Sequence, residues 1–275
     1  MRNSVSKRET KRDYTVQSLE RGLQVLRCFT PAKPKLSLQE IADKLGIPKG
    51  SAFRMVATLE ALGYLVQDPE TKRYRVDIGV LDLGFTYLAG LGYPDVALPH
   101  LQRLAHETQE SASMAVLDDL DVVYVARASI QRVMSINLSI GSRLPAYCTS
   151  LGKVLLAHLD EKTLEERLRR LGQPQKLTPY TIADPETLRR HLVEIRHKGY
   201  AINDQELELG LRSVAAPVRD ARGEVVAAIN VSTVAARVSV ADIERQVVPK
   251  LLRCAATISA QLGYRPVGHL VAPVG

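Results

Sequence analysis

The stretch LSLQEIADKLGIPKGSAFRMVATLEALGYL, residues 36–65, decides the fold of the first part of the chain. Ser37 and Glu40 have the spacing of a capping box, in which each side chain bonds to the other residue's backbone N–H, and this predicts the start of a helix. Gly46 is a residue type that ends helices, and Pro48 is one that the first turn of the next helix tolerates. The stretch therefore predicts two helices joined by a short turn, which is a helix-turn-helix.

The second of these helices has one apolar and one more polar face. The apolar residues recur at helical spacing and are expected to pack inward: Ala52, Met55, Val56, Leu59 and Leu62. The major groove of DNA admits such a helix, and its outward side chains then reach base edges or phosphates. We expect these contacts from Lys49, Ser51, Arg54 and Thr58. Arg54 is the candidate reader, because a guanidinium group meets both acceptors of a guanine.

The flanking sequence extends the motif to a winged helix-turn-helix. Ser18 is expected to cap a preceding helix. Tyr64 to Gln67 and Lys72 to Val76 predict the two strands of a hairpin around a turn. Alternation along the second strand is expected to bury Tyr74 and Val76. The same alternation turns three basic side chains outward toward phosphate: Lys72, Arg73 and Arg75.

The distribution of charge agrees with a polyanion partner at this end of the chain. The net charge is +7, and residues 1–90 carry 15 Lys and Arg against 10 Asp and Glu, whereas residues 91–275 carry 22 against 20. The first third therefore holds +5 of the total. A solvated basic surface has the same charge, and winged helices also bind proteins, but the basic residues fall on the expected groove face and wing, which favours double-stranded DNA.

The rest of the chain predicts an α+β domain after a helical linker. Residues 78–89 and 95–108 predict two helices, the first with apolar residues that pack within the chain or against a second copy: Ile78, Leu81, Phe85, Tyr87 and Leu88. From residue 111 onward, five short segments predict strands: 111–117, 122–128, 132–138, 212–219 and 224–232. Helices are expected from Thr149, Glu161 and Pro185, and a long one from Ser239 to Leu262. This order predicts an antiparallel sheet with helices packed on it.

Four polar residues lie within otherwise apolar strands and are candidate ligand contacts: Asn203, Ser213, Asn230 and Ser232. Asn230 and Ser232 alternate along one strand, so they project from the same face of the sheet. A ligand pocket is mostly apolar with a few placed polar groups, which is the composition of these strands. The alternative is that each side chain satisfies a neighbouring backbone group.

Longer strings carry a resemblance to a known family. The strings SLERGLQVLRCF (18–29), LSLQEIADKLGIPKGSAFRMVATLEALGYL (36–65) and YRVDIGVLDLG (74–84) closely resemble the DNA-binding domain of the IclR family of bacterial transcription regulators. NLSIGSRLPAYCTSLGKVLLA (137–157), GYAINDQELELGLRSVAAPV (199–218) and VVAAINVS (225–232) resemble its effector-binding domain. The likeness spans roughly residues 15–262, and RLPAYCTSLGKVLLA resembles most the branch that governs protocatechuate and 4-hydroxybenzoate catabolism (PcaR, PcaU and PobR).

The resemblance implies a domain plan and a function. It implies a basic flexible tail (1–14), a winged helix-turn-helix domain (15–77), a helical linker (78–94), a GAF-like effector domain (95–264) and a C-terminal tail (265–275). It implies a homodimer or tetramer that binds operator DNA and a small organic acid. The branch implies an activator of aromatic-compound degradation genes of the β-ketoadipate, protocatechuate and 4-hydroxybenzoate type; the alternative is a repressor of another small-acid operon.

The resemblance also adds effector contacts to the four strand residues. The loop from Tyr147 to Gly152, with Tyr147 and Ser150, is expected to form a further wall of the pocket. An anionic effector is expected to meet an arginine that bonds its carboxylate through two N–H groups, and the candidates are Arg143, Arg212 and Arg127.

A few residues suggest other chemistry, none of it well supported. Ser150 and Lys153 match the S-x-x-K pattern of acyl-transfer enzymes, but the pattern is short, and a helix cap at Thr149 or Ser150 explains the serine; we expect no enzyme. The six histidines and three cysteines lack metal-ligand spacing, and no phosphate-binding loop is present, so we expect no metal and no cofactor. No apolar run is long enough to span a membrane and no signal peptide is evident, so we expect a soluble cytoplasmic protein.

Overall fold

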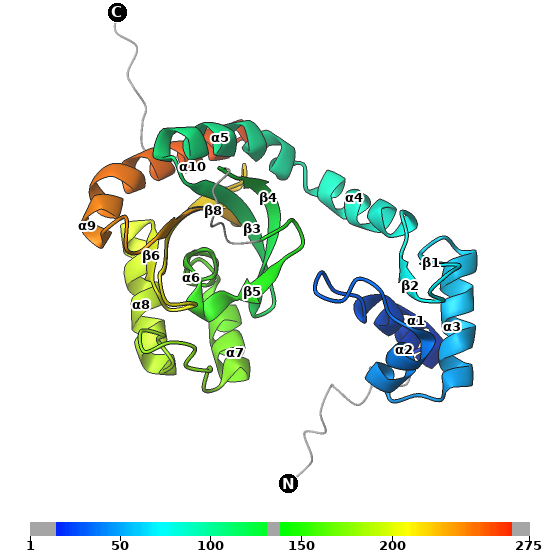
Figure 1. Cartoon of the computed structure of the whole chain (residues 1–275). Helices are drawn as coiled ribbons and strands as arrows, with labels where there is room; N and C mark the ends of the chain where they lie inside the picture. The colour runs from blue at the N-terminus through cyan, green and yellow to red at the C-terminus, as the bar shows by residue number, and fades with distance from the viewer. Residues whose placement is uncertain (1–14, 131–137, 266–275) are drawn as a thin grey trace, which may run out of the picture. The chain divides into compact units, whose positions relative to one another are not determined.

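The computed structural model describes residues 15–130 and 138–265, and within them the chain divides into two compact units, one up to Gly90 and one from Leu91 (Figure 1). The fold is α+β, as expected. Three expectations lie outside the described residues: the tail of residues 1–14, nearly all of the strand at 132–138, and the C-terminal tail after Arg265.

The first unit is a helix-turn-helix with a small hairpin. Its elements are α1 (Gln17–Arg27), α2 (Leu38–Leu45), α3 (Lys49–Ala61), the antiparallel strands β1 (Leu65–Gln67) and β2 (Tyr74–Val76), and α4 (Gly79–Leu91). The capping box is confirmed, since the Ser37 side chain accepts from Glu40 N and Ser37 N donates 2.8 Å to the Glu40 carboxylate. Gly46 ends α2 in the left-handed conformation, with φ 62°. The core is formed by residues in or beside α1, α2, α3 and the hairpin: Val25, Cys28, Leu36, Ile41, Val56, Leu59, Leu65 and Tyr74.

Three local predictions in this unit are wrong. Val16, not Ser18, is the N-cap of α1, so Ser18 lies inside the first turn. Leu62 is 63% exposed, because it is the C-cap residue beyond the last helical residue of α3. Val76 is 40% exposed, although Tyr74 is buried as expected. Leu36 bridges to Tyr74 at the covered end of β2, whereas Val76 stands at the end where the chain leaves the hairpin.

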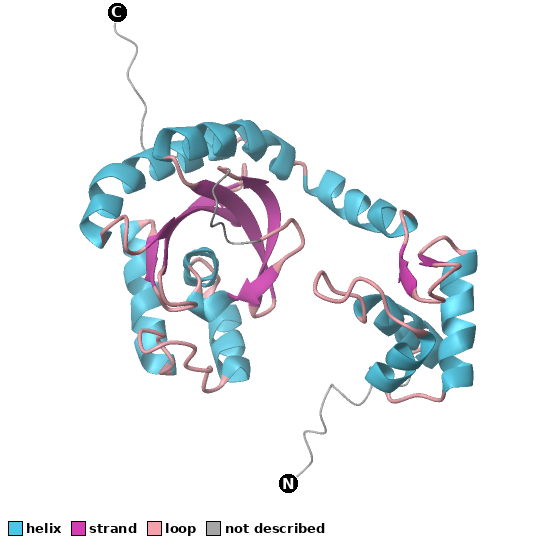
Figure 2. Ribbon diagram, in the orientation of Figure 1, coloured by secondary structure: helices cyan, strands magenta, loops and turns pink. Residues whose placement is uncertain are grey.

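The second unit is built on one six-stranded antiparallel sheet. Its strands are β3 (Ser111–Asp118), β4 (Asp121–Ala128), β5 (Arg143–Pro145), β6 (Ala201–Asp204), β7 (Leu211–Arg219) and β8 (Val225–Val234), in the spatial order β5-β4-β3-β8-β7-β6. The hairpin turn from Asp220 to Gly223 lies where the sequence predicts it. Figure 2 shows that the sheet is strongly curled.

Helices cover both faces of this curled sheet. The helical segments are α5 (Tyr93–Thr108), η2 (Ala146–Cys148), α6 (Ser150–Ala157), α7 (Glu161–Leu171), α8 (Pro185–Lys198), α9 (Val240–Asp242), η3 (Ile243–Val247) and α10 (Val248–Gln261). α5 and α10 lie on the outer face, and α6 lies inside the curve (Figure 1). Every residue of α6 is buried. The sheet therefore wraps around α6, whose N-terminal end becomes part of the interior.

The long C-terminal helix predicted from Ser239 to Leu262 is present with one interruption. Ser239 caps it, and a π-helical turn, η3, separates α9 from α10. Pro249 follows this turn. Proline has no N–H to donate to the preceding turn, and its ring clashes with a backbone carbonyl of that turn. The irregular turn is thus explained by the proline.

Candidate functional site

The outward face of α3 carries the side chains expected to meet DNA. Lys49, Arg54 and Thr58 are exposed, and Ser51 is half-buried. The Thr58 hydroxyl donates 2.8 Å to the carbonyl of Arg54, so it is already bonded within its own helix. The structure also exposes Phe53, 52% accessible beside Arg54, a residue that the helical pattern alone did not single out. Phe53 lies outside the apolar stripe of α3, and this is the sequence signal that could have identified it. Apolar side chains in the major groove contact the methyl group of thymine.

The wing presents its basic side chains to solvent, but two of them have carboxylate partners within the chain. Arg73 pairs with Glu40 at 3.1 Å and donates to the carbonyl of Lys35, and Arg75 lies 3.7 Å from Asp77. These pairs are exposed, and such pairs contribute little free energy. A phosphate group can therefore replace the carboxylate at small cost.

In the second unit, polar side chains line a cavity of about 190 Å³ between the sheet and α6. Asn203, Ser213 and Ser232 are cross-strand neighbours on β6, β7 and β8, so they form one row across the sheet. Asn230 lies two residues from Ser232 on the same face. The structure therefore brings the four strand residues together, and Ser150 joins them from α6 through a 2.8 Å hydrogen bond to the Ser213 hydroxyl.

A close approach of backbone segments places Ser150 at this cavity. Thr149 caps α6 by accepting a hydrogen bond from Gly152 N, as the sequence predicts for Thr149 or Ser150. A Cβ atom at Gly152 would lie 2.2 Å from the carbonyl oxygen of Ala146 in η2. Glycine therefore allows η2 to lie directly against α6, and this puts Cys148, Thr149 and Ser150 in the cavity wall.

One buried polar atom at the cavity has no partner. The Asn230 side chain is 2% exposed and donates 3.0 Å from Nδ2 to the Ser232 hydroxyl. Among the described residues, Asn230 Oδ1 is the one buried side-chain nitrogen or oxygen without a hydrogen bond. A buried acceptor left in this state costs free energy, so it marks a position where a ligand donor is favoured.

The remaining cavity wall is apolar and largely uncharged. It comprises Tyr124, Leu138, Leu144, Cys148, Leu207 and Leu211. Burial raises the pKa of the Tyr124 phenol to about 12. Burial, reinforced by the negative charge of Glu206, also raises the pKa of the Cys148 thiol to about 12. Both groups are therefore neutral at pH 7, and Glu208 is the one charged side chain among the described lining residues.

Two of the three candidate arginines lie outside this lining. Arg143 is exposed and pairs with Asp118 at 2.7 Å and with Asp121. Arg212 pairs with Asp204 at 2.7 Å and donates to two backbone carbonyls. Each guanidinium is instead held by a carboxylate, a pairing that spacing along the chain does not reveal.

The third arginine and the tyrosine of the loop are also placed beside the cavity wall rather than in it. Arg127 is the cross-strand neighbour of Ser113, which in turn faces Asn230, so it shares the sheet face of the cavity residues. It donates 3.2 Å to the Ser113 hydroxyl. The Tyr147 hydroxyl donates 2.8 Å to the carbonyl of Gln175.

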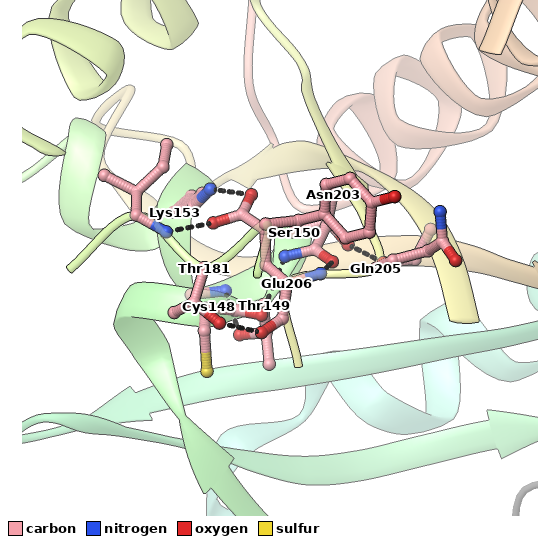
Figure 3. A network of polar contacts seen from close by, with 12 residues as sticks. Cys148, Thr149, Ser150, Lys153, Thr181, Asn203, Gln205 and Glu206 are labelled. Carbon is pink, nitrogen blue, oxygen red and sulfur yellow. Dashed lines mark hydrogen bonds and ion pairs between the residues drawn. The ribbon is translucent and has the colours of Figure 1, made fainter. Parts of the chain in front are cut away.

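Ser150 and Lys153 do not act on each other. Figure 3 shows that Lys153 Nζ is ion-paired with Glu206. The Ser150 hydroxyl is instead hydrogen-bonded to the Ser213 hydroxyl. An acyl-transfer pair needs the lysine within hydrogen-bond reach of the serine. Each member of the S-x-x-K pattern is engaged elsewhere.

Two further observations concern residues 15–130 and 138–265. No cluster of three or more His, Cys, Asp or Glu side chains in these ranges has the arrangement to hold a metal ion. None of their helices has the length and apolar character that crossing a bilayer requires.

Both units match known sequence families. Residues 18–69 match the IclR helix-turn-helix domain, and residues 85–260 match the family described as bacterial transcriptional regulator IclR C-terminal. The chain belongs to the IclR family. The family resemblance noted in the sequence is thereby confirmed, and both families describe regulators rather than enzymes.

IclR relatives of known name cover most of the chain. The chain is 41% identical over 246 residues to the Pca regulon regulatory protein of Pseudomonas putida, and the match covers 89% of this chain and 84% of the relative. It is 35% identical to the p-hydroxybenzoate hydroxylase transcriptional activator of Acinetobacter baylyi, covering 90% and 92%. The crystal structure of an IclR homolog complexed with 4-hydroxybenzoate, from Microbacterium hydrocarbonoxydans, is 27% identical with a TM-score of 0.80, covering 90% of this chain and 99% of that one.

Proposed function

We propose that this IclR-family chain is a cytoplasmic activator of aromatic-compound degradation genes and that its effector is a hydroxylated aromatic acid. The names of the Pseudomonas and Acinetobacter relatives and the 4-hydroxybenzoate complex of the Microbacterium homolog support the class of effector and of target genes. The first unit reads the operator through α3 and the wing, and the second unit binds the effector in the cavity beside α6.

The unpartnered Asn230 Oδ1 is the observation that carries the effector proposal. An aromatic ring fits between the apolar walls formed by Tyr124 and the leucines, and its phenolic O–H donates to Asn230 Oδ1. The hydroxyl groups of Ser213 and Ser232 accept or donate hydrogen bonds at the other polar edges of the ligand. A hydroxybenzoate satisfies the orphan acceptor, whereas an unsubstituted benzoate leaves it unsatisfied.

The linker supports assembly of two copies. Ile78, Leu81 and Tyr87 on or beside α4 are 72%, 59% and 54% exposed. Large apolar side chains grouped on one helix favour burial against a partner, and the commonest geometry for identical chains is a two-fold pair. We propose a homodimer in which these residues pack between copies, with a tetramer as a further stage of assembly.

The proposed effector is tested by titrating the purified chain with 4-hydroxybenzoate, 3-hydroxybenzoate, protocatechuate and benzoate in a calorimeter. We expect at least one hydroxylated acid to bind about two- to tenfold more tightly than benzoate, since one neutral hydrogen bond contributes about 0.5–1.5 kcal/mol. Ser213→Leu should abolish binding by filling the cavity, while leaving operator binding nearly unchanged because α3 belongs to the other unit. A folded Ser213→Leu protein with wild-type affinity would remove the cavity from the proposal.

The sign of regulation is tested in cells. A reporter fused to the promoter beside the chain's operator should rise with the effector in the presence of the wild-type protein. A reporter that is high without the protein, and low with it, would identify a repressor instead.

A further inference from the structure

A charged pair lies directly behind the effector cavity. Lys153, on α6 one turn after Ser150, is 0% exposed, and its ammonium group is ion-paired with the carboxylate of Glu206, which is 5% exposed. Taking two charges out of water costs several kcal/mol for each ion, and an apolar pair of similar volume is often as stable. Stabilisation of the fold therefore does not explain why these two residues are charged, which directs attention to the segments that the pair connects.

The Glu206 residue joins three segments of the chain. Its carboxylate accepts from Ile182 N at 3.2 Å as well as from Lys153, and its carbonyl accepts 2.6 Å from the Thr181 hydroxyl. Its own N–H donates 3.3 Å to Asn203 Oδ1, and Asn203 Nδ2 donates 2.7 Å to the carbonyl of Cys148. Figure 3 shows this chain of bonds running from α6 through Glu206 and Asn203 to η2.

The segments joined in this way are walls of the cavity on their other side. Residues 148–150 line it from η2 and the start of α6, and Asn203 lines it from the end of β6. The loop after β6 continues from Glu206 into Leu207 and Glu208, which are lining residues too. Lys153 and Glu206 themselves are not among the lining residues that the structure describes. They contact the backbone and side chains that carry the wall, not the space a ligand would fill.

We propose that the buried ion pair of Lys153 and Glu206 is a positioning element of the effector cavity, which fixes residues 203–211, from the end of β6 through the following loop to the start of β7, against α6. The proposal rests on the proposed function, because it assigns the pair a role in holding that same cavity. An ion pair with hydrogen bonds is directional, so it sets the angle of the loop as well as its distance from α6. Asn203 is then held with its amide already committed to Cys148, and the ligand meets a preformed wall.

The test uses the full chain with two charges removed together. Lys153→Met or Glu206→Gln alone leaves an uncompensated buried charge and is expected to destabilise the fold strongly. The double variant K153M/E206Q avoids this, because both side chains become neutral and the glutamine carbonyl still accepts from Ile182 N. Glu110→Gln is the control: Glu110 is also a buried carboxylate, 7% exposed, but its ion-pair partner Arg237 is 44% exposed, so the substitution leaves no buried charge, and Glu110 is not a cavity-lining residue.

Two readouts separate positioning from general stability. In hydrogen exchange followed by mass spectrometry, the double variant should exchange at least about tenfold faster in residues 203–211, while the central strands β3 and β8 keep wild-type protection. In calorimetric titration with the hydroxylated acid that binds the wild type most tightly, its affinity should be about tenfold weaker. Glu110→Gln should change neither quantity, even if it lowers the unfolding free energy.

Wild-type exchange in residues 203–211 of the folded double variant would overturn the proposal, as would unchanged effector affinity. If the wild type binds none of the four acids tested above, the proposed effector class fails, and the exchange measurement alone then decides whether the pair positions the loop. Faster exchange spread evenly over the whole second unit would also count against the proposal, because it would indicate a merely stabilising pair.

Discussion

The tight approach of η2 to α6 makes a strong prediction for Gly152→Ala. The added Cβ would lie 2.2 Å from the carbonyl oxygen and 2.3 Å from the Cα atom of Ala146, whereas ordinary contacts begin near 3.4 Å. The two backbone segments must therefore separate by about 1 Å, and neither is a flexible side chain that can swing aside. We expect a loss of about 3 kcal/mol, at the upper end of the overpacking range, partly offset by about 1 kcal/mol from the better helix propensity of alanine.

The net loss should appear in two assays. Thermal denaturation followed by circular dichroism should show the second unit melting several degrees lower, since 1 kcal/mol corresponds to about 2–4 °C for a domain of this size. Effector affinity should fall as well, because the segment that moves carries Cys148, Thr149 and Ser150. Gly22→Ala in α1 is the control: no heavy atom would lie within 4 Å of the added methyl group, so the first unit should gain up to about 1 kcal/mol. A Gly152→Ala protein within about 1 kcal/mol of the wild type, with unchanged effector affinity, would refute the reasoning.

Three further predictions concern DNA binding and pH. Arg54→Ala should cost about 1–3 kcal/mol on the operator and relax the preference at one base pair, measured by fluorescence anisotropy on operator variants; equal loss on random duplex would show that Arg54 is not a reader. Arg73→Ala should weaken binding to all sequences and lower the slope of log affinity against log salt by about one, and an unaltered slope would remove Arg73 from the phosphate contacts. Because burial raises the pKa of Tyr124 to about 12, the folded state holds this proton more tightly than the unfolded state, in which the phenol titrates near 10. The contribution of this group to the free energy of unfolding is therefore fully present below about pH 10 and should fall between about pH 10 and 12, by at most about 1.4 kcal/mol per pH unit. The midpoint of urea unfolding, measured at about pH 9 and about pH 11, should fall by less in Tyr124→Phe than in the wild type.

Local chemistry made much of the fold predictable from the sequence. The capping box of Ser37 and Glu40, the left-handed Gly46 and the turn from Asp220 to Gly223 are each set by residues a few positions apart. Short apolar segments on either side of turns likewise located β3, β4, β7 and β8, and alternation along β8 placed Asn230 and Ser232 on one face. These features depend on the chain's near neighbours, which a sequence displays directly.

The features that depend on distant neighbours were less predictable. The exposure of Val76 and Leu62 depends on where the covering elements end, and the three-residue strand β5 is too short to show a period. Arg143 and Arg212 were reasonable carboxylate partners by type, yet each has an acidic partner that only the folded sheet brings near. The pairing of Lys153 with Glu206 joins residues 53 positions apart, so the S-x-x-K spacing suggested a serine partner where the fold supplies a glutamate.

The strand order of the second unit also bears on how the protein is made. The two strands at the middle of the sheet are β3 and β8, and their register joins Ser111 to Ser232, about 120 residues later in the chain. A ribosome must therefore release nearly the whole polypeptide before the centre of the sheet can close. Until then β3 has only β4 as a partner, and the edge that β8 will cover stays open to other chains. The first unit, whose contacts are complete by Gly90, can fold while the rest is still being synthesised.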